Sequence, residues 1–504
     1  MPKPLLVFVH GWSVTSTSTY GALPARLQAE AARAGGPGLD VAHVHLGQYV
    51  SFRDEVRMED VARAFDRAIA RVLAEAGPGR RFACITHSTG GPVVREWLDR
   101  FHVQAGTLDA CPMSHLVMLA PANFGSALAQ LGKSRLGAMK AWFNGVEPGQ
   151  GVLDWLEVAS PESNALNLRW INDYPALRLT SRPNPVFPFV LSGDAIDRKL
   201  YDHVNAYTGE TGGDGVVRLA AANLNARHVV LAQAPLVPGE ALPSARKRLR
   251  GLRVVSSTRA PATAFKIVPG VSHSGTDLGI MASVRDDGRP HATVDAILRC
   301  LRVADGAGYE ALRAAFDAEN ARHQDITRRL EIEKIPVLPD RVYIHDPHAM
   351  VVFRLLDDGG SRVPDMNLLL TAGPAADPNQ LPEGFLTDRQ GNRRAPGNLC
   401  FFLNHAALTG CPAIVDADGR QRRPERIPRP PYGLRLMPRQ DGKWVEHWAA
   451  ELAADAGSLL DLIEPNQTTI IDLRLTRVVR EGVFRFTTQL APRSFKRDEP
   501  GPPA

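Results

Sequence analysis

The stretch from residue 81 to 91, RFACITHSTGG, constrains the fold most, because an apolar run ends abruptly in a polar serine followed by two glycines. Residues 82 to 85 predict a buried strand of a parallel sheet. Residues 92 to 101, PVVREWLDRF, predict an amphipathic helix with proline in its first turn, where the missing N–H group costs nothing. Ser88 is therefore expected on a sharp strand-to-helix turn that lifts its hydroxyl clear of the sheet.

A turn of this kind is strained and requires small residues two positions on either side of its central residue. Thr86 and Gly90 occupy those positions. The pattern is the G-x-S-x-G nucleophile elbow with threonine in place of the first glycine, and it resembles the α/β-hydrolase lipases and esterases. The resemblance makes Ser88 the candidate nucleophile and His87 part of its support. A serine in an ordinary glycine-rich turn is the alternative interpretation.

A second motif lies upstream, where the apolar run LLVFVHGW, residues 5 to 12, leads directly into His10 and Gly11. It is similar to the HG loop of lipases. The resemblance implies an oxyanion hole made by the backbone N–H groups of Trp12 and Thr89, and one such donor lowers the barrier by roughly 3 to 4 kcal/mol. The alternative for His10 is a histidine that caps a strand end.

A serine hydroxyl needs a histidine base and a carboxylate that orients it, and in this fold the chain order is serine, acid, histidine. Residues 265 to 275, FKIVPGVSHSG, predict a short strand and a loop with His273, where the family has its histidine. His273 is therefore the candidate base. His291, near the start of a helix predicted over 292–303, is the second choice, and a plain surface histidine is the alternative for both.

The candidate acid is Asp214. It precedes Gly-Val-Val in the segment 208–224, TGETGGDGVVRLAAANL, which is similar to the D-G-x-V loop of many bacterial lipases and lecithin:cholesterol acyltransferase relatives. Asp194, which follows a strand predicted over 186–191, occupies the position that other α/β-hydrolases use and remains a competitor. An aspartate before glycine is more often a turn residue.

The remaining pattern of the first 305 residues alternates strands, such as 40–46, with helices, such as 58–77. This alternation predicts an α/β class fold, a doubly wound and mostly parallel sheet with its site at the carboxyl ends of the strands. Between 129 and 185 the alternation stops, and aromatic and aliphatic residues predict a cap or lid over the site. A helical insertion with its own small core is the alternative.

The length of the chain and a change in its residue pattern predict further domains. A chain of 504 residues exceeds one ordinary core. We expect a catalytic domain over 1–305, a charged helical connector over 306–339, and a β-rich, sandwich-like domain over 340–504, where short Val, Leu, Ile and Phe runs alternate with turn residues. His345, Asp346, His348 and His405 lie in the last segment with no spacing typical of metal ligands. We expect no metal and no cofactor.

The distribution of charged residues restricts the kinds of molecule that we expect the chain to bind. The chain has 59 basic and 54 acidic residues, and its basic loop at 419–431, GRQRRPERIPRPP, can touch anionic phospholipid head groups or simply be solvated. The sequence contains no basic helix with interleaved aromatic residues, so we do not expect it to bind nucleic acid. Five cysteines predict no disulfide framework. The apolar start belongs to the first strand, so we expect synthesis in the cytoplasm without a cleaved leader and no transmembrane segment.

The elbow together with D-G-V-V also resembles the GPI inositol deacylases and the phospholipase effectors of bacterial type VI secretion, over about residues 5 to 303. The resemblance implies a serine ester hydrolase acting on lipid or phospholipid esters, with a membrane surface as a partner. Export by a leaderless route, with a secretion or immunity protein as partner, is a further hypothesis. An esterase of soluble esters, an acyltransferase and a non-catalytic adaptor with a hydrolase fold are the alternatives.

Overall fold

The computed structural model describes residues 3–9, 16–33, 38–45, 53–129, 149–196, 211–325, 329–334, 340–439, 444–452 and 458–479, and five positions between 488 and 496. Its first sheet has six strands, all parallel, in the order β2-β1-β3-β4-β5-β8. The strands are β1 (Leu5–Val9), β2 (Asp40–Val44), β3 (Phe82–His87), β4 (Met113–Leu119), β5 (Phe187–Gly193) and β8 (Ala264–Val268).

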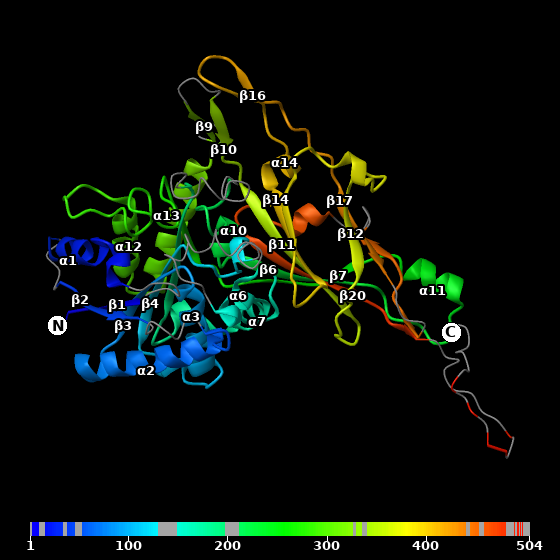
Figure 1. The fold of residues 1–504 in the computed structure, drawn as a ribbon, viewed down its shortest axis with the longest axis horizontal. Coiled ribbons are helices and arrows are strands. Elements are labelled where there is room, and N and C mark those ends of the chain that lie inside the picture. The colour runs from blue at the N-terminus through cyan, green and yellow to red at the C-terminus, as the bar shows by residue number, and fades with distance from the viewer. Residues whose placement is uncertain are drawn as a thin grey trace.

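Alternate side chains of each strand point to opposite sides of this sheet, and apolar side chains are buried on both sides. Val7 and Cys84 belong to one buried cluster and Phe8 and Ile85 to the other. Helices α2 (Met58–Ala76) and α3 (Gly90–Leu98) lie along one side, and α1 (Leu23–Arg33), α12 (Ala292–Leu301) and α13 (Gly306–His323) lie along the other (Figure 1). The predicted doubly wound α/β sheet is confirmed.

The connector after this sheet is helical over only part of its predicted length. Helix α13 ends at His323, and residues 330 to 333 form strand β9 (Leu330–Glu333), which pairs antiparallel with β10 (Arg341–Ile344). The sequence LEIE alternates apolar and charged residues with the period of a strand, and Glu333 faces Arg341 across the pair. The charged residues of this stretch suggested a solvated helix, but residues 330–333 belong to a two-stranded antiparallel sheet.

The second sheet has six strands in the order β13-β14-β11-β20-β6-β7. Strands β6 (Ala226–Ala232) and β7 (Arg253–Arg259) precede residue 305 in the chain. The others are β11 (His348–Asp357), β13 (Leu386–Gly391), β14 (Asn398–Asn404) and β20 (Thr468–Leu475). The pairs β11–β20 and β20–β6 are parallel and the remaining pairs antiparallel. Two strands of the predicted catalytic segment thus lie in the second sheet, which the predicted division at residue 305 did not anticipate.

The second sheet packs against a three-stranded antiparallel sheet, so the β-rich part is sandwich-like as predicted. The smaller sheet consists of β12 (Met366–Ala372), β17 (Tyr432–Pro438) and β19 (Ala450–Leu452). Phe353 and Phe401 lie in the core between the two sheets, with ring centroids 5.3 Å apart. On the opposite face of the second sheet, Val352 and Phe402 belong to the core of the first. The central strands β14, β11 and β20 are therefore buried on both faces, whereas most residues of the edge strands β7 and β13 are exposed.

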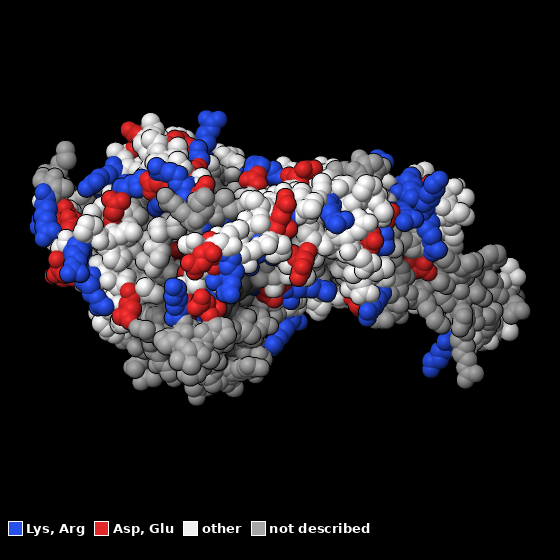
Figure 2. All heavy atoms as spheres, turned by 90° about the horizontal axis from the view of Figure 1, so that it is seen from above, with Lys and Arg blue, Asp and Glu red and all other residues white. Residues whose placement is uncertain are grey.

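The remaining strands form small pairs. Strand β15 (Ile414–Val415) pairs with β16 (Gln421–Arg423), and β18 (Val445–Glu446) pairs with β21 (Val478–Val479). The hairpins that contain β9, β10 and β16 project on one side of the molecule (Figure 1). Seen from that side, basic and acidic side chains are interspersed (Figure 2). In the described ranges, every helix is too short or too polar to cross a membrane.

Candidate active site

Ser88 lies at the end of β3, in the turn that leads into α3. It has φ of 53°, in the left-handed region that residues with a side chain rarely adopt, and such a conformation costs on the order of 1 to 3 kcal/mol. Its backbone N–H donates to the carbonyl of Leu119 at 3.0 Å, which fixes the turn to the end of β4. The strained turn predicted from the sequence is present, and its serine side chain is only partly buried.

Close packing around the turn explains why the residues near Ser88 are small. A Cβ atom on Gly90 would lie 3.3 Å from Cβ of Thr86 and 3.3 Å from the carbonyl oxygen of Val9. One on Gly91 would lie 2.8 Å from Cβ of Pro121. Thr86, which stands in place of the usual glycine, is fully buried beside these contacts. The elbow therefore packs closely against β1 and the end of β4.

The structure brings His273 and Asp214 together. Nδ1 of His273 lies 3.0 Å from Oδ2 of Asp214, and the backbone N–H of His273 donates to the carbonyl of Asp214 at 3.0 Å. Oδ1 of Asp214 accepts from the N–H groups of Val216 and Val217 at 3.1 and 2.8 Å. Both side chains are buried. A neutral imidazole in this arrangement carries its proton on Nδ1, which leaves the lone pair of Nε2 free to accept a proton.

His87 connects this pair to the elbow. Nε2 of His87 lies 3.0 Å from the carbonyl oxygen of His273, and the two ring centroids are 4.7 Å apart. Since His87 directly precedes Ser88, the contact holds the loop that carries His273 beside the turn that carries Ser88. The sequence placed His87 in the elbow motif but gave no sign of this long-range contact, which joins residues 186 positions apart.

Only half of the predicted oxyanion hole lies in the part of the chain that the structure describes. Thr89 is buried at the start of α3, where helix N–H groups have no partner within the helix. His10, Gly11 and Trp12 lie outside the described residues. The two donors remain a prediction.

The two alternative residues have other partners. Asp194 forms an ion pair with His323 of α13 and accepts the N–H of Gly270 at 3.1 Å. His291 caps α12, because its Nδ1 accepts the N–H of Thr293 at 3.2 Å, while its Nε2 lies 3.1 Å from the hydroxyl of Ser283. The geometry therefore favours Asp214 and His273 over both.

The predicted cap contains three helices in its described part, α6 (Gln150–Leu156), α7 (Pro161–Asn172) and α8 (Tyr174–Leu177). Trp155, Leu166 and Trp170 are at most 3% exposed and belong to the main core. These side chains pack as a helical insertion does rather than as an apolar cover. Residues 130–148, which include the other aromatic residues of the predicted lid, lie outside the described ranges.

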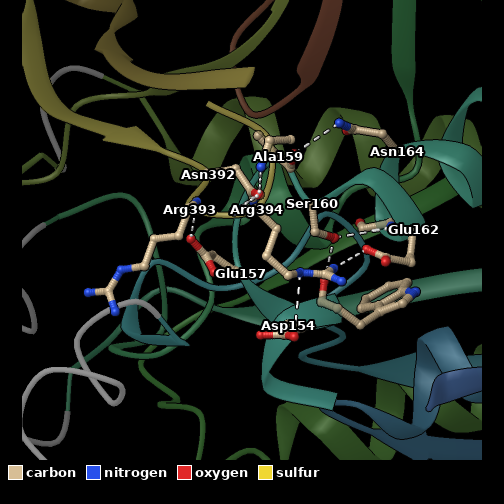
Figure 3. Close-up of polar contacts among 12 residues, drawn as sticks. Asp154, Glu157, Ala159, Ser160, Glu162, Asn164, Asn392, Arg393 and Arg394 are labelled. Carbon is tan, nitrogen blue, oxygen red and sulfur yellow. Dashed lines mark hydrogen bonds and ion pairs between the residues drawn. The ribbon is translucent and has the colours of Figure 1, made fainter. Parts of the chain in front are cut away.

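The turn between β13 and β14 holds these helices (Figure 3). Nδ2 of Asn398 donates to the carbonyl of Ala159 at 2.8 Å, and the N–H of Arg393 donates to Oε1 of Glu157 at 2.9 Å. Arg394 forms ion pairs with Asp154 of α6 and Glu162 of α7. The β-rich part thus contacts helices α6 and α7 and the loop between them.

A buried arginine joins the elbow helix to the cap, and the sequence analysis missed it. Arg95 of α3 donates to Oδ1 of Asn167 in α7 at 2.9 Å and to Oδ1 of Asn123 at 3.2 Å. Burial lowers the pKa of Arg95 to about 10. The signal in the sequence was an arginine within the apolar run after Ser88.

A parallel sheet with a strained serine elbow, and with an aspartate and histidine hydrogen-bonded beside it, defines an α/β-hydrolase, the class of the lipases and esterases. No protein-family model and no curated protein matches the chain. Among solved structures, the chain is similar to phospholipase PlaB from Legionella pneumophila, alone and in complex with thio-NAD. Identity is 38%, each chain is covered over 98% of its length, and the TM-score is 0.80.

The chain belongs to the family of this phospholipase and is a carboxylic ester hydrolase. The predicted resemblance to the α/β-hydrolase lipases and esterases is confirmed. The mature lipase BlEst2 of Bacillus licheniformis is also similar, at 19% identity over 44% of this chain and 80% of its own, with a TM-score of 0.32.

Two largely buried histidines, one in each of the large sheets, predict a loss of stability in mild acid. Burial lowers the pKa of His348, which stacks on Phe402, to about 4, and does the same for His115 of β4. Below pH 6.5 the unfolded chain binds protons at these positions and the folded chain does not. The free energy of unfolding should therefore fall between pH 6.5 and 4, by about 3 kcal/mol per histidine at the lower limit. Denaturant titrations of His348→Gln and His115→Gln should each give a shallower dependence on pH, and an unchanged slope in both would contradict this account.

Proposed function

We propose that the chain hydrolyses phospholipid esters through an acyl-enzyme on Ser88. The observation that carries the proposal is the buried hydrogen bond between Asp214 and His273, held beside the elbow by His87. The relation to a phospholipase supports the substrate class.

In this proposal each residue has a separate chemical role. Nε2 of His273 takes the hydroxyl proton of Ser88 as Oγ attacks the ester carbonyl, and the same proton then goes to the leaving alkoxide. Asp214 fixes the proton of neutral His273 on Nδ1 and stabilises the imidazolium that forms. N–H groups of Thr89 and Trp12 stabilise the oxyanion. Water, activated by His273, finally releases the fatty acid and frees Ser88.

Substitution of the three residues tests the mechanism, with a matched control for each. Ser88→Ala and His273→Asn should lower kcat by a factor of roughly 10⁵ to 10⁶, and Asp214→Asn by about 10⁴, because the residues act as a unit. The controls are Ser244→Ala, an exposed serine, and His291→Asn and Asp194→Asn, the two alternative residues. A fluorophosphonate probe should label the wild type at Ser88 and leave Ser88→Ala unlabelled. Full activity of Ser88→Ala would refute the proposal, and loss of activity in an alternative variant would reassign that role.

Phospholipid specificity is tested by comparing hydrolysis rates on phospholipid vesicles and on soluble esters. The wild type should release fatty acid from phosphatidylcholine and phosphatidylglycerol vesicles faster than it hydrolyses short soluble esters at equal ester concentration. Stronger binding to the anionic vesicles would support contact between the basic loop at 419–431 and head groups. A preference for soluble esters would favour an esterase, and ester formation with added alcohols in place of fatty-acid release would favour an acyltransferase.

Export by a leaderless route, as in type VI effectors, stays a prediction. Its test is growth of bacteria in which the chain is directed to the periplasm. Inhibition that Ser88→Ala abolishes is expected, and normal growth with active wild-type enzyme in the periplasm would count against it.

A further inference from the structure

The loop that carries Asp214 lies between the two sheets. The chain leaves the first sheet at the end of β5, passes through Asp214 and helix α10 (Leu219–Ala222), and enters the second sheet as β6. His273, by contrast, follows β8 of the first sheet. The distance between their side chains therefore depends on how the second sheet is held against the first.

The loop folds back on itself around Asp214. The N–H of Asp214 donates to the carbonyl of Val217 at 3.2 Å, and the N–H of Leu219 donates to the carbonyl of Gly212 at 2.9 Å. Arg218 directly follows the two valines whose N–H groups hold the Asp214 carboxylate. A shift of Arg218 would therefore move the donors that orient the acid.

The side chain of Arg218 contacts two strands of the second sheet. It is nearly buried and forms an ion pair with Asp388 of β13. Its guanidinium carbon lies 4.1 Å from the ring centroid of Phe402 in β14. The contacts of a buried arginine that is paired with a carboxylate and stacked on an aromatic ring are strongly directional, because the planar guanidinium fixes both at once.

The other end of the loop rests on the same surface. His348 of β11 stacks on Phe402 with ring centroids 4.6 Å apart and 12° between the ring planes. A Cβ atom on Gly212 would lie 2.8 Å from Nδ1 of His348, so the backbone of Gly212 packs directly on this ring. Strands β11, β13 and β14 thus support the loop at residues 212 and 218, on both sides of Asp214.

We propose that Arg218 is a positioning residue for catalysis, which anchors the Asp214 loop to Asp388 and Phe402 of the second sheet and so sets the hydrogen bond between Asp214 and His273. The inference rests on the proposed roles of Asp214 and His273. It makes the β-rich part a component of the catalytic site, because a displacement of about 1 Å of a catalytic group can cost a factor of about 100 in rate.

The test measures kcat, KM and the pH profile of kcat/KM for Arg218→Gln, Arg218→Lys and Asp388→Asn in the full chain, on one fluorescent ester. We expect kcat to fall about 10- to 100-fold in Arg218→Gln, with KM changed less than about threefold. Arg218→Lys should recover part of the loss, since it keeps the charge but not the stacked plane. The acidic limb should move to lower pH, because a displaced Asp214 stabilises the imidazolium of His273 less.

A purely structural role would give a different result. It would reduce the fraction of folded enzyme, which lowers kcat measured per total protein but leaves the position of the acidic limb unchanged. Arg354→Gln is the matched control, because Arg354 of β11 pairs with Asp472 of β20 in the same sheet at 2.8 Å. That variant should lose stability and keep the wild-type limb.

A double-mutant cycle tests the pair itself. The combined variant Arg218→Gln/Asp388→Asn should lose no more in kcat than the worse single variant, since either change already breaks the anchor. Independent, additive losses would overturn the pairing. If Arg218→Gln does not fold, Arg218→Lys and Asp388→Asn decide the outcome by the same readouts.

The outcomes separate this inference from the proposed function. Wild-type kcat and an unmoved acidic limb in folded Arg218→Gln and Asp388→Asn, with Asp214→Asn still inactive, would overturn the positioning role alone. Full activity of Asp214→Asn would instead overturn the proposed triad.

Discussion

The hydrogen bond between Nδ1 of His273 and Oδ2 of Asp214 joins loops that depend on different sheets. In an isolated doubly wound sheet, both loops would follow neighbouring strands, and the sheet alone would fix their distance. Here the chain passes from Asp214 into β6 of the second sheet. The site therefore requires that the two sheets pack in one fixed arrangement.

Burial of the central strands of the second sheet on both faces provides that arrangement. Its strands place alternate residues in the core with the smaller sheet and in the core of the first sheet, as Phe401 and Phe402 do in β14. A strand with only one apolar face would leave the sandwich free to move as a separate module. Polar contacts then set the direction of the packing, because hydrogen bonds such as that from the hydroxyl of Thr468 to the carbonyl of Ala220, at 2.7 Å, have a narrow range of geometry.

Features that depend on near neighbours in the chain could be predicted from the sequence. The elbow at Ser88 is recognisable locally, since the left-handed turn and the close approach of Thr86 and Gly90 involve a few consecutive residues. The segments holding Asp214 and His273 were found through the family's order of motifs. Membership of β6 in the second sheet was not predictable, because the sequence of a seven-residue strand carries no information about which strand it pairs with. The contact of Arg218 with Asp388, 170 positions away, could not be predicted for the same reason.

The cap shows how the same residues support different interpretations. Tryptophan and leucine between 129 and 185 suggested a mobile apolar cover, yet Trp155 and Trp170 lie in the main core. Asn392 is buried in the turn after β13, and its side chain donates to the carbonyl of Val158 at 3.3 Å. Moving helices α6 and α7 as a lid would break this hydrogen bond and that of Asn398, and would expose both tryptophans to water. Because each buried polar group left unpaired costs about 1 to 3 kcal/mol, these contacts favour fixed positions for the described helices of the cap.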